Sequence, residues 1–365
     1  MKKRIVSRSL LAVTLLAPGA SAWETKDHKM IVALAIEHSP PQLAAFLRDH
    51  LAEVMQGAVD PDLRFMDTLN HTYHVEHGTR DNPDHVAYLA SALVAMMRNR
   101  APAAMVAYWF GALSHYVADI DQPLHTSDKD QNENWYHLLF EALGRGFEYR
   151  SEVLGVELEV KLGKALSGWQ FPYDGQHDAI ADVRSWQVAN AIWANRYYDE
   201  IGRIYTQRGS FDAGRLAAIY RQCIAEAIND VIDLWAHVLG SQADLLPAAT
   251  LAALPRQDEV LLLDVDRHGR VEQGGKRVTP EELALVVRQY SSARPRNREG
   301  PRASVYVEID DRCQESVAAR LEATCAACGI TGFSAILVRK GTWTSRLYRA
   351  VKVHAASLVG EERRR

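Results

Sequence analysis

The chain has 365 residues and a formal net charge of −4, and 47% of its residues are hydrophobic and 24% are charged. This balance is typical of a globular protein and excludes wholesale disorder, while the length suits two domains. The charge argues against a protein that binds nucleic acid through a large basic surface, and four cysteines are too few for a disulfide scaffold.

The first 22 residues have the features of a secretory signal peptide. A basic start at Lys2–Arg4 precedes a short apolar run over 9–17, and Ala20–Ala22 offers a small-residue cleavage site. The apolar run is too short to span a bilayer. Cleavage would make Trp23 the new N-terminus and, by removing four positive charges and no acids, change the net charge from −4 to −8. A periplasmic or secreted protein is therefore expected.

Apolar residues recur at helical spacing from residue 23 to about residue 245, which predicts a mainly helical domain. The expected helices cover residues 28–38, 41–55, 83–98, 102–123, 133–143, 182–206 and 211–239. Two long loops, 57–82 and 163–178, separate some of them, and loops of this length in a compact domain are often functional.

A different pattern follows a linker over 246–257. Short strands are expected over 260–265, 270–273, 303–309 and 333–338, and helices over 279–290 and 314–328. The start of the first of these helices is marked by Thr279 as N-cap, with Glu282 in the capping-box position. The sequence thus predicts a small α+β domain over 258–340, of ββαβαβ order, followed by a basic C-terminal tail over 341–365.

Histidines concentrate in the helical region, which holds 12 of the 14. His115 and Asp119 are four residues apart, as are His137 and Glu141, so each pair shares one helix face. One such pair alone would more often be a surface ion pair. Two pairs, with His125 ten residues beyond His115, instead favour a metal site, and mixed imidazole and carboxylate ligands suit zinc.

Other candidate ligands lie upstream of these pairs. His28 stands at the start of the first helix, close to the N-terminus that cleavage would create. At that end, a free α-amino group on Trp23 could chelate a metal together with its own carbonyl oxygen, whereas an internal amide nitrogen could not. The first long loop adds Asp60, Asp62, His71, His74 and His77.

Taken in chain order, these candidate ligands resemble those of the trinuclear zinc phospholipase C and S1/P1 nuclease superfamily. The motif is His115-Tyr116-x-x-Asp119-x-x-Gln122-Pro123-x-His125, continued by His137-x-x-x-Glu141. Trp23 and the segment His28–Val32 also match. The resemblance covers roughly residues 23–240 and implies a helical phospholipase C/P1 nuclease-like domain that binds three zinc ions.

The resemblance also implies which residues hold each ion. The implied ligands are Trp23 and His28 for the first zinc, Asp62, His74 and His115 for the second, His125, His137 and Glu141 for the third, and Asp119 as a bridge between the first two. The Gly57-Ala58-x-x-Pro61-Asp62 segment favours Asp62 over Asp60, and the Tyr-His context favours His74 over His71. Asp60 and His71 remain the alternatives that this loop offers.

The activity that this resemblance implies is that of a secreted zinc-dependent phosphoesterase, in which a zinc-bound hydroxide attacks phosphorus. Asp62 would orient or deprotonate the water in addition to binding zinc. The alternative is that Asp62 is a zinc ligand only.

Glu141 and the Gly-x-x-x-Pro-Asp segment resemble the phospholipase C branch of the superfamily. The nuclease branch typically carries Asp in place of this Glu, and Trp-Ala-Asp in place of this segment. Hydrolysis of phospholipid phosphodiesters is therefore favoured. The alternatives are an S1/P1-type single-strand nuclease and 3′-nucleotidase, and a non-catalytic zinc-binding envelope protein.

The expected partners are a phospholipid or another phosphodiester substrate and, through peripheral contact, a membrane surface. No stable nucleic-acid partner is expected.

Residues 258–340 more distantly resemble the periplasmic domain of ExbD/TolR-type proteins. The resemblance lies in the Val260–Val265 strand, the Asp266–Val271 turn and the Val278–Leu283 helix start. This resemblance suggests a protein–protein or self-association module, with a stabilising appendage as the alternative. Cys325 and Cys328 lie at a helix end, which argues against redox catalysis and leaves open a local disulfide or one with Cys313.

Overall fold

The computed structural model describes residues 23–65, 69–141, 143, 179–207, 212–240, 251, 254–255, 260–292, 303–310, 312–314, 316–330 and 332–338. The predicted signal peptide, the loop over 163–178, most of the linker and the basic tail lie outside the described residues. Within the described part, no helix combines the length and the apolar character that a membrane crossing requires.

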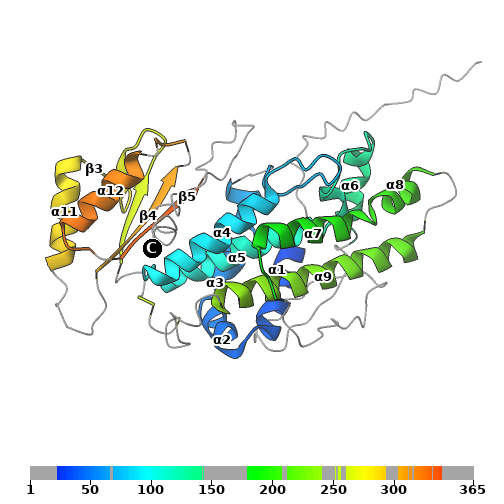
Figure 1. Ribbon diagram of the computed structural model, residues 1–365, viewed down its shortest axis with the longest axis horizontal. Coiled ribbons are helices and arrows are strands. Elements are labelled where there is room, and N and C mark those ends of the chain that lie inside the picture. Colours follow the sequence, from blue (N-terminus) through cyan, green and yellow to red (C-terminus); the bar gives the residue numbers. More distant parts are fainter. Residues whose placement is uncertain are drawn as a thin grey trace, which may run out of the picture.

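The N-terminal domain is helical, as expected (Figure 1). Its elements are α1 Thr25–His38, α2 Pro41–Asp49, α3 Leu51–Gly57, the π-helix η1 Pro61–Phe65, α4 Asn82–Arg98, α5 Ala103–Ile120, the short 3₁₀ helix η2 Pro123–His125, α6 Glu133–Glu141, α7 Val183–Asn195, α8 Tyr198–Thr206 and α9 Ala213–Gly240. Two helices predicted as single are interrupted. The first divides at His50, whose backbone leaves the helical region (φ −122°, ψ 36°), and the second at the turn of Arg196 and Tyr197.

Helix α5 is the central element of the domain. Every residue in it except Met105 is buried, because α1, α3, α4, α7 and α9 pack around it. This explains why the helix is apolar on all sides apart from the few polar groups near its end. Polar side chains placed on such a helix are held in a fixed position away from bulk water.

Two glycines bring α3 against α5. A Cβ atom on Gly57 would lie 1.9 Å from the carbonyl oxygen of Tyr108, and one on Gly111 would lie 2.0 Å from that of Val54. Any larger residue at either position would force the two backbones apart. Because η1 follows α3 directly, this close crossing sets where the η1 residues stand relative to α5.

The C-terminal domain contains a mixed five-stranded sheet of order β3-β2-β1-β4-β5. Its elements are β1 Leu261–Val265, β2 Val271–Gln273, β3 Lys276–Val278, α11 Pro280–Ser292, β4 Ser304–Asp310, α12 Ser316–Ala327 and β5 Gly332–Val338. Strands β1, β4 and β5 run parallel, and β1, β2 and β3 antiparallel. The predicted two-domain class is confirmed, with one strand, β3, added.

The added strand is a short edge strand. Gly274 and Gly275 have φ of +55° and +76°, the backbone geometry of the tight turns that join hairpin strands, and β2 and β3 pair on either side of them. The predicted capping box is present at the following helix, where Thr279 Oγ1 accepts from the Glu282 backbone N–H at 3.2 Å. All four cysteines lie in the described part of the chain and are free.

Both faces of the sheet are covered. Val305 and Val307 of β4 belong to a core shared with α11 and α12, whereas Tyr306 of β4 and Ile336 of β5 belong to the core of the helical domain. The sheet therefore packs between its own helices and the helical domain, at the end where α4 and α5 meet it (Figure 1).

Candidate metal centre

Three groups of potential metal ligands converge in the helical domain. They are His28, Asp62 and His115; His71, His115 and Asp119; and His125, His137 and Glu141, and within each group the ligand atoms all lie within 4.8 Å of one another. Every member except Asp62 is buried, and Asp62 is nearly so, with 13% of its side chain exposed. The structure thus brings together all the predicted side-chain ligands except His74.

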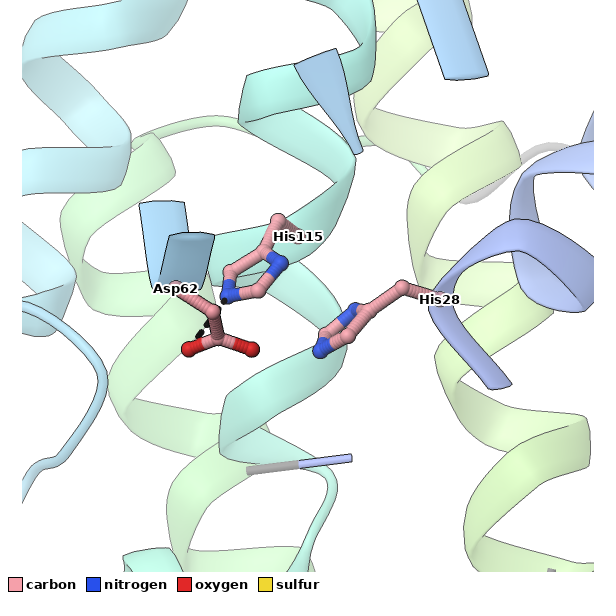
Figure 2. A group of neighbouring side chains, drawn as sticks. All are labelled: His28, Asp62 and His115. Atoms are coloured by element: carbon pink, nitrogen blue, oxygen red, sulfur yellow. Dashed lines mark ion pairs between the residues drawn. The ribbon is translucent and has the colours of Figure 1, made fainter. Parts of the chain in front are cut away.

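Figure 2 shows the first group, in which side chains from α1, η1 and α5 point toward one another. The His28 ring stacks on the His115 ring, with centroids 3.7 Å apart and planes 16° from parallel. The Nε2 atom of His115 lies 3.7 Å from an oxygen of Asp62. The other ring nitrogen of His115, Nδ1, donates a hydrogen bond to the Ala58 carbonyl at 2.8 Å. This bond fixes the tautomer and leaves the Nε2 lone pair for a metal.

Asp119 lies between the first group and the second. Its Oδ1 is 3.3 Å from His28 Nε2, and its Oδ2 is 2.8 Å from His71 Nδ1 and 3.4 Å from His115 Nε2. One carboxylate therefore faces different histidines with its two oxygens. This is the arrangement that a bridging ligand between two metal ions requires.

The third group is assembled around α6. His137 Nε2 lies 2.9 Å from Glu141 Oε1, one helical turn along. Its Nδ1 donates to Glu133 Oε1 at 2.9 Å, and Glu133 in turn accepts a hydrogen bond from the Tyr198 hydroxyl. His125 Nδ1 donates to the His71 carbonyl at 2.9 Å, so its Nε2 is directed to the group as an acceptor. Carboxylates and carbonyls that orient imidazoles in this way are typical of zinc sites.

The chemistry of these atoms fits a bound cation. Among the residues that the structure describes, both ring nitrogens of His28, Oδ1 of Asp119 and Nε2 of His125 are buried without a hydrogen bond. Leaving buried polar groups unsatisfied costs about 1–3 kcal/mol each, so native proteins rarely cluster them. Metal coordination would satisfy one ring nitrogen of His28, Oδ1 of Asp119 and Nε2 of His125.

Burial also sets the protonation states toward metal binding. Burial, reinforced by neighbouring imidazoles, lowers the pKa of His28 and of His125 well below the usual range, so both rings are neutral at pH 7. Burial raises the pKa of Asp119 and raises that of Glu141 to about 7. For His137, burial opposes the charged form, but hydrogen bonds that its ring donates to Glu133 and Glu141 outweigh this effect and raise the pKa to about 9. A cation would favour the ionised carboxylates and the neutral imidazoles that ligation needs.

Trp23 is fully buried beside this cluster. Its indole Nε1 donates to the Ala118 carbonyl at 2.8 Å, and Ala118 immediately precedes Asp119 on α5. Its ring also meets Tyr220 edge-on, with centroids 5.0 Å apart. These contacts hold residue 23 next to the helical turn that carries Asp119, and the role of its α-amino group remains a proposal.

The loop assignments differ in part from those expected. His71, rather than His74, lies in the groups. His74 Nδ1 instead lies 3.0 Å from Asp128 Oδ2, because a turn to Thr79 carries the residue away. Asp60 is engaged elsewhere and accepts from the Tyr108 hydroxyl at 2.6 Å. Asp62, on the π-helix η1, points into the first group, in agreement with the preference for it over Asp60.

Sequence reasoning did not identify the residues that orient the ligands. Glu133 stands four residues before His137, so the spacing Glu133-x-x-x-His137-x-x-x-Glu141 could have revealed it. The Ala58 and His71 carbonyls, which orient His115 and His125, have no sequence signal, because every residue carries such a group.

The comparison with protein families agrees with the motif. Residues 27–151 match the family described as zinc dependent phospholipase C. Among solved structures, alpha-toxin of Clostridium perfringens (avian strain SWCP) is 15% identical, with 62% of this chain and 66% of that one covered and a TM-score of 0.42. Alpha toxin from Clostridium absonum is 14% identical, with 67% and 69% covered and a TM-score of 0.37. No curated protein matches the chain. Through residues 27–151, the N-terminal domain is thus related to the zinc dependent phospholipase C family.

Proposed function

We propose that this protein is a zinc-dependent phosphoesterase that hydrolyses phospholipid phosphodiesters in the manner of a phospholipase C. The observation that supports this most strongly is the buried Asp119 carboxylate, which faces His28 with one oxygen and His71 with the other. A buried anion between imidazoles suits two cations side by side, and the third group lies nearby through the His71–His125 hydrogen bond. Export through residues 1–22 to the periplasm or the exterior is part of the same proposal.

The proposal assigns a ligand set to each of three zinc ions. The sets are Trp23 (α-amino nitrogen and carbonyl oxygen) with His28; Asp62, His71 and His115; and His125, His137 and Glu141, with Asp119 shared by the first two. When bound, zinc would neutralise charge on phosphate oxygens and lower the pKa of water toward ~7. The chain's own contribution is to hold the imidazoles in the right tautomer, through Ala58, His71 and Glu133.

Asp62 is proposed to have a second role. Its side chain is 13% exposed, whereas that of Asp119 is fully buried, so Asp62 is the ligand carboxylate within reach of a water that enters from solvent. A carboxylate in this position can orient the water and accept its proton while the phosphorus–oxygen bond forms. The alternative, in which Asp62 is a ligand only, predicts that Asp62→Asn changes zinc affinity and activity in proportion.

Apolar side chains beside the ligands favour a lipid substrate. Leu63, next to Asp62, is 62% exposed, and Leu138 and Leu139, which follow His137, are 43% and 47% exposed. Exposed apolar residues that gather in one patch often contact a ligand or a surface, whereas single exposed ones are common. A phospholipid combines an anionic phosphodiester with acyl chains, and the three exposed leucines lie on η1 and α6, the same two elements that carry Asp62, His137 and Glu141.

The test is a side-by-side assay of the zinc-loaded chain that begins at Trp23. Phosphatidylcholine vesicles are expected to yield diacylglycerol and phosphocholine, and single-stranded DNA is expected to stay intact, with Asp119→Asn as the inactive control. Cleavage of DNA without turnover of lipid would contradict the proposal and favour the S1/P1-type nuclease. Bound zinc without hydrolysis of either substrate, or of p-nitrophenylphosphorylcholine, would favour the non-catalytic zinc-binding protein.

A further inference from the structure

We propose that the C-terminal domain is a positioning element of the metal centre, in which Glu308 and Tyr306 of β4 fix the η1 segment that carries Asp62. This inference rests on the function proposed above and assigns the second domain a part in it. The face of β4 that its own helices leave uncovered packs on the helical domain, near α5 and η1.

A polar contact joins the two domains at η1. Arg64 Nη2 lies 3.2 Å from Glu308 Oε2, and the two residues are 244 positions apart in the chain. Arg64 Nη1 also donates to the Tyr108 hydroxyl at 3.4 Å and lies 3.9 Å from Asp60. The Glu308 side chain is only 14% exposed, so the ion pair is partly shielded from water on one side.

An aromatic contact joins the same elements beside the ion pair. Phe65, the last residue of η1, stacks on Trp109 of α5 with centroids 5.9 Å apart and planes 14° from parallel. The Trp109 indole Nε1 donates to the Tyr306 hydroxyl at 3.0 Å, and both of these side chains are buried. Because a buried indole N–H without an acceptor is costly, this bond constrains Trp109 and, through it, Phe65.

Asp62 lies between two sets of contacts that fix the η1 segment, one within the helical domain and one with the C-terminal domain. On its N-terminal side, Asp60 is held within the helical domain by the Tyr108 hydroxyl at 2.6 Å. On its C-terminal side, the contacts of Arg64 and Phe65 lead to Glu308 and Tyr306 of the other domain. Because η1 is a π-helix of only five residues, a single turn, contacts from outside it contribute more to fixing its side chains.

The rest of the interface also contains close and specific contacts. The Asn99 side chain donates to the Phe333 carbonyl at 2.9 Å. A Cβ on the neighbouring Gly332 would lie 2.5 Å from the Asn99 carbonyl oxygen, so β5 approaches the end of α4 as closely as glycine allows. The two domains therefore meet through specific backbone contacts as well as through apolar side chains.

The experiment compares Glu308→Gln with wild type in the full chain beginning at Trp23, loaded with zinc. Glutamine keeps the size of the side chain and removes the charge that pairs with Arg64. We expect the ion at the Asp62 group to be lost to a chelator about 3- to 5-fold more readily, the size of effect typical of one partly exposed ion pair. The value of kcat on phosphatidylcholine should fall by a similar factor, with KM unchanged.

Three further variants make the result specific. Asp84→Asn breaks a comparable ion pair with Arg184, at 2.9 Å, and should leave zinc retention unchanged. In the Arg64→Gln background, Glu308→Gln should add no further effect, because the two side chains act as one pair. Tyr306→Phe, which removes the acceptor of the Trp109 indole, should weaken retention of the same ion.

The outcomes separate this inference from the proposed function. If wild type holds zinc and Glu308→Gln retains it as Asp84→Asn does, the inference is wrong and the proposed function stands. A lower melting temperature with unchanged zinc retention also overturns it, since that is the mark of a purely structural contact. A wild-type chain that binds no zinc at Asp62 overturns both.

Discussion

Replacing Asp119 by Asn is expected to release zinc from the first two ligand groups and to lower phosphodiesterase activity by at least about 10³-fold. The reason is that one carboxylate serves both groups: its Oδ1 lies 3.3 Å from His28 and its Oδ2 lies 2.8 Å from His71. An amide presents one neutral oxygen and an NH₂ donor in the same volume. It can neither bridge two cations nor offset their charge.

The effect of Asp119→Asn on the free energy of unfolding should have opposite signs in the metal-free and the zinc-loaded protein. Without metal, an ionised Asp119 is unfavourable because it is completely buried, and burial raises its pKa for this reason. Asn carries no charge, so the metal-free variant is expected to be at least as stable as metal-free wild type. With zinc present, wild type gains the free energy of binding and the variant loses most of it. Melting temperatures measured in EDTA and in zinc therefore test the assignment without any substrate.

The matched control is His74→Ala. His74 is also a buried histidine of the same loop region, but it pairs with Asp128 at 3.0 Å and lies outside the three groups. This variant should melt at a lower temperature in EDTA and in zinc alike, and it should keep its zinc. If Asp119→Asn retains full zinc content, or if it destabilises the metal-free chain as much as the zinc-loaded one, Asp119 is not a bridging ligand.

A second large effect is expected from a single residue added before Trp23. Such an extension converts the basic α-amino group into an amide nitrogen, which does not bind zinc. The ion shared by Trp23, His28 and Asp119 should then bind on the order of 10²-fold more weakly. The indole contact with the Ala118 carbonyl at 2.8 Å should survive, because it does not involve the terminus. The chain should therefore remain folded while losing one ion.

This prediction is checked with a tag that a protease removes immediately before Trp23. Zinc content and activity are measured on one preparation before and after cleavage, so the sequence from Trp23 onward is identical in both samples. Recovery of one zinc ion and of activity on cleavage is the expected result. Equal zinc content in the tagged and the cleaved chain would exclude the α-amino group as a ligand.

The sequence predicts the helical part of the site well, for a geometric reason. His115 with Asp119, and His137 with Glu141, lie one turn apart on regular helices, and that spacing alone places their side chains together. The loop between η1 and α4 has no such period. The choice of His71 over His74 depends on the turn that pairs His74 with Thr79, and on the acceptance of the His125 hydrogen bond by the His71 carbonyl. Neither contact has a signature in the spacing of residues.

The contact between the second domain and the η1 segment could not be predicted from the sequence, because it also depends on residues that are far apart in the chain. Arg64 and Glu308 are 244 positions apart, so only the tertiary structure brings them together. The strand containing Val305, Tyr306 and Val307 does carry one usable sign, because its apolar residues do not alternate. A continuous apolar run predicts a strand buried on both faces. It does not say that the second face meets the helical domain rather than another helix or another chain.

Zinc content tests the central claim most directly. The chain beginning at Trp23, purified without chelator and dialysed against zinc-free buffer, is measured by mass spectrometry of the metal against protein concentration. The convergence of the three ligand groups predicts about three zinc ions per chain. One ion or none per folded chain would contradict the account.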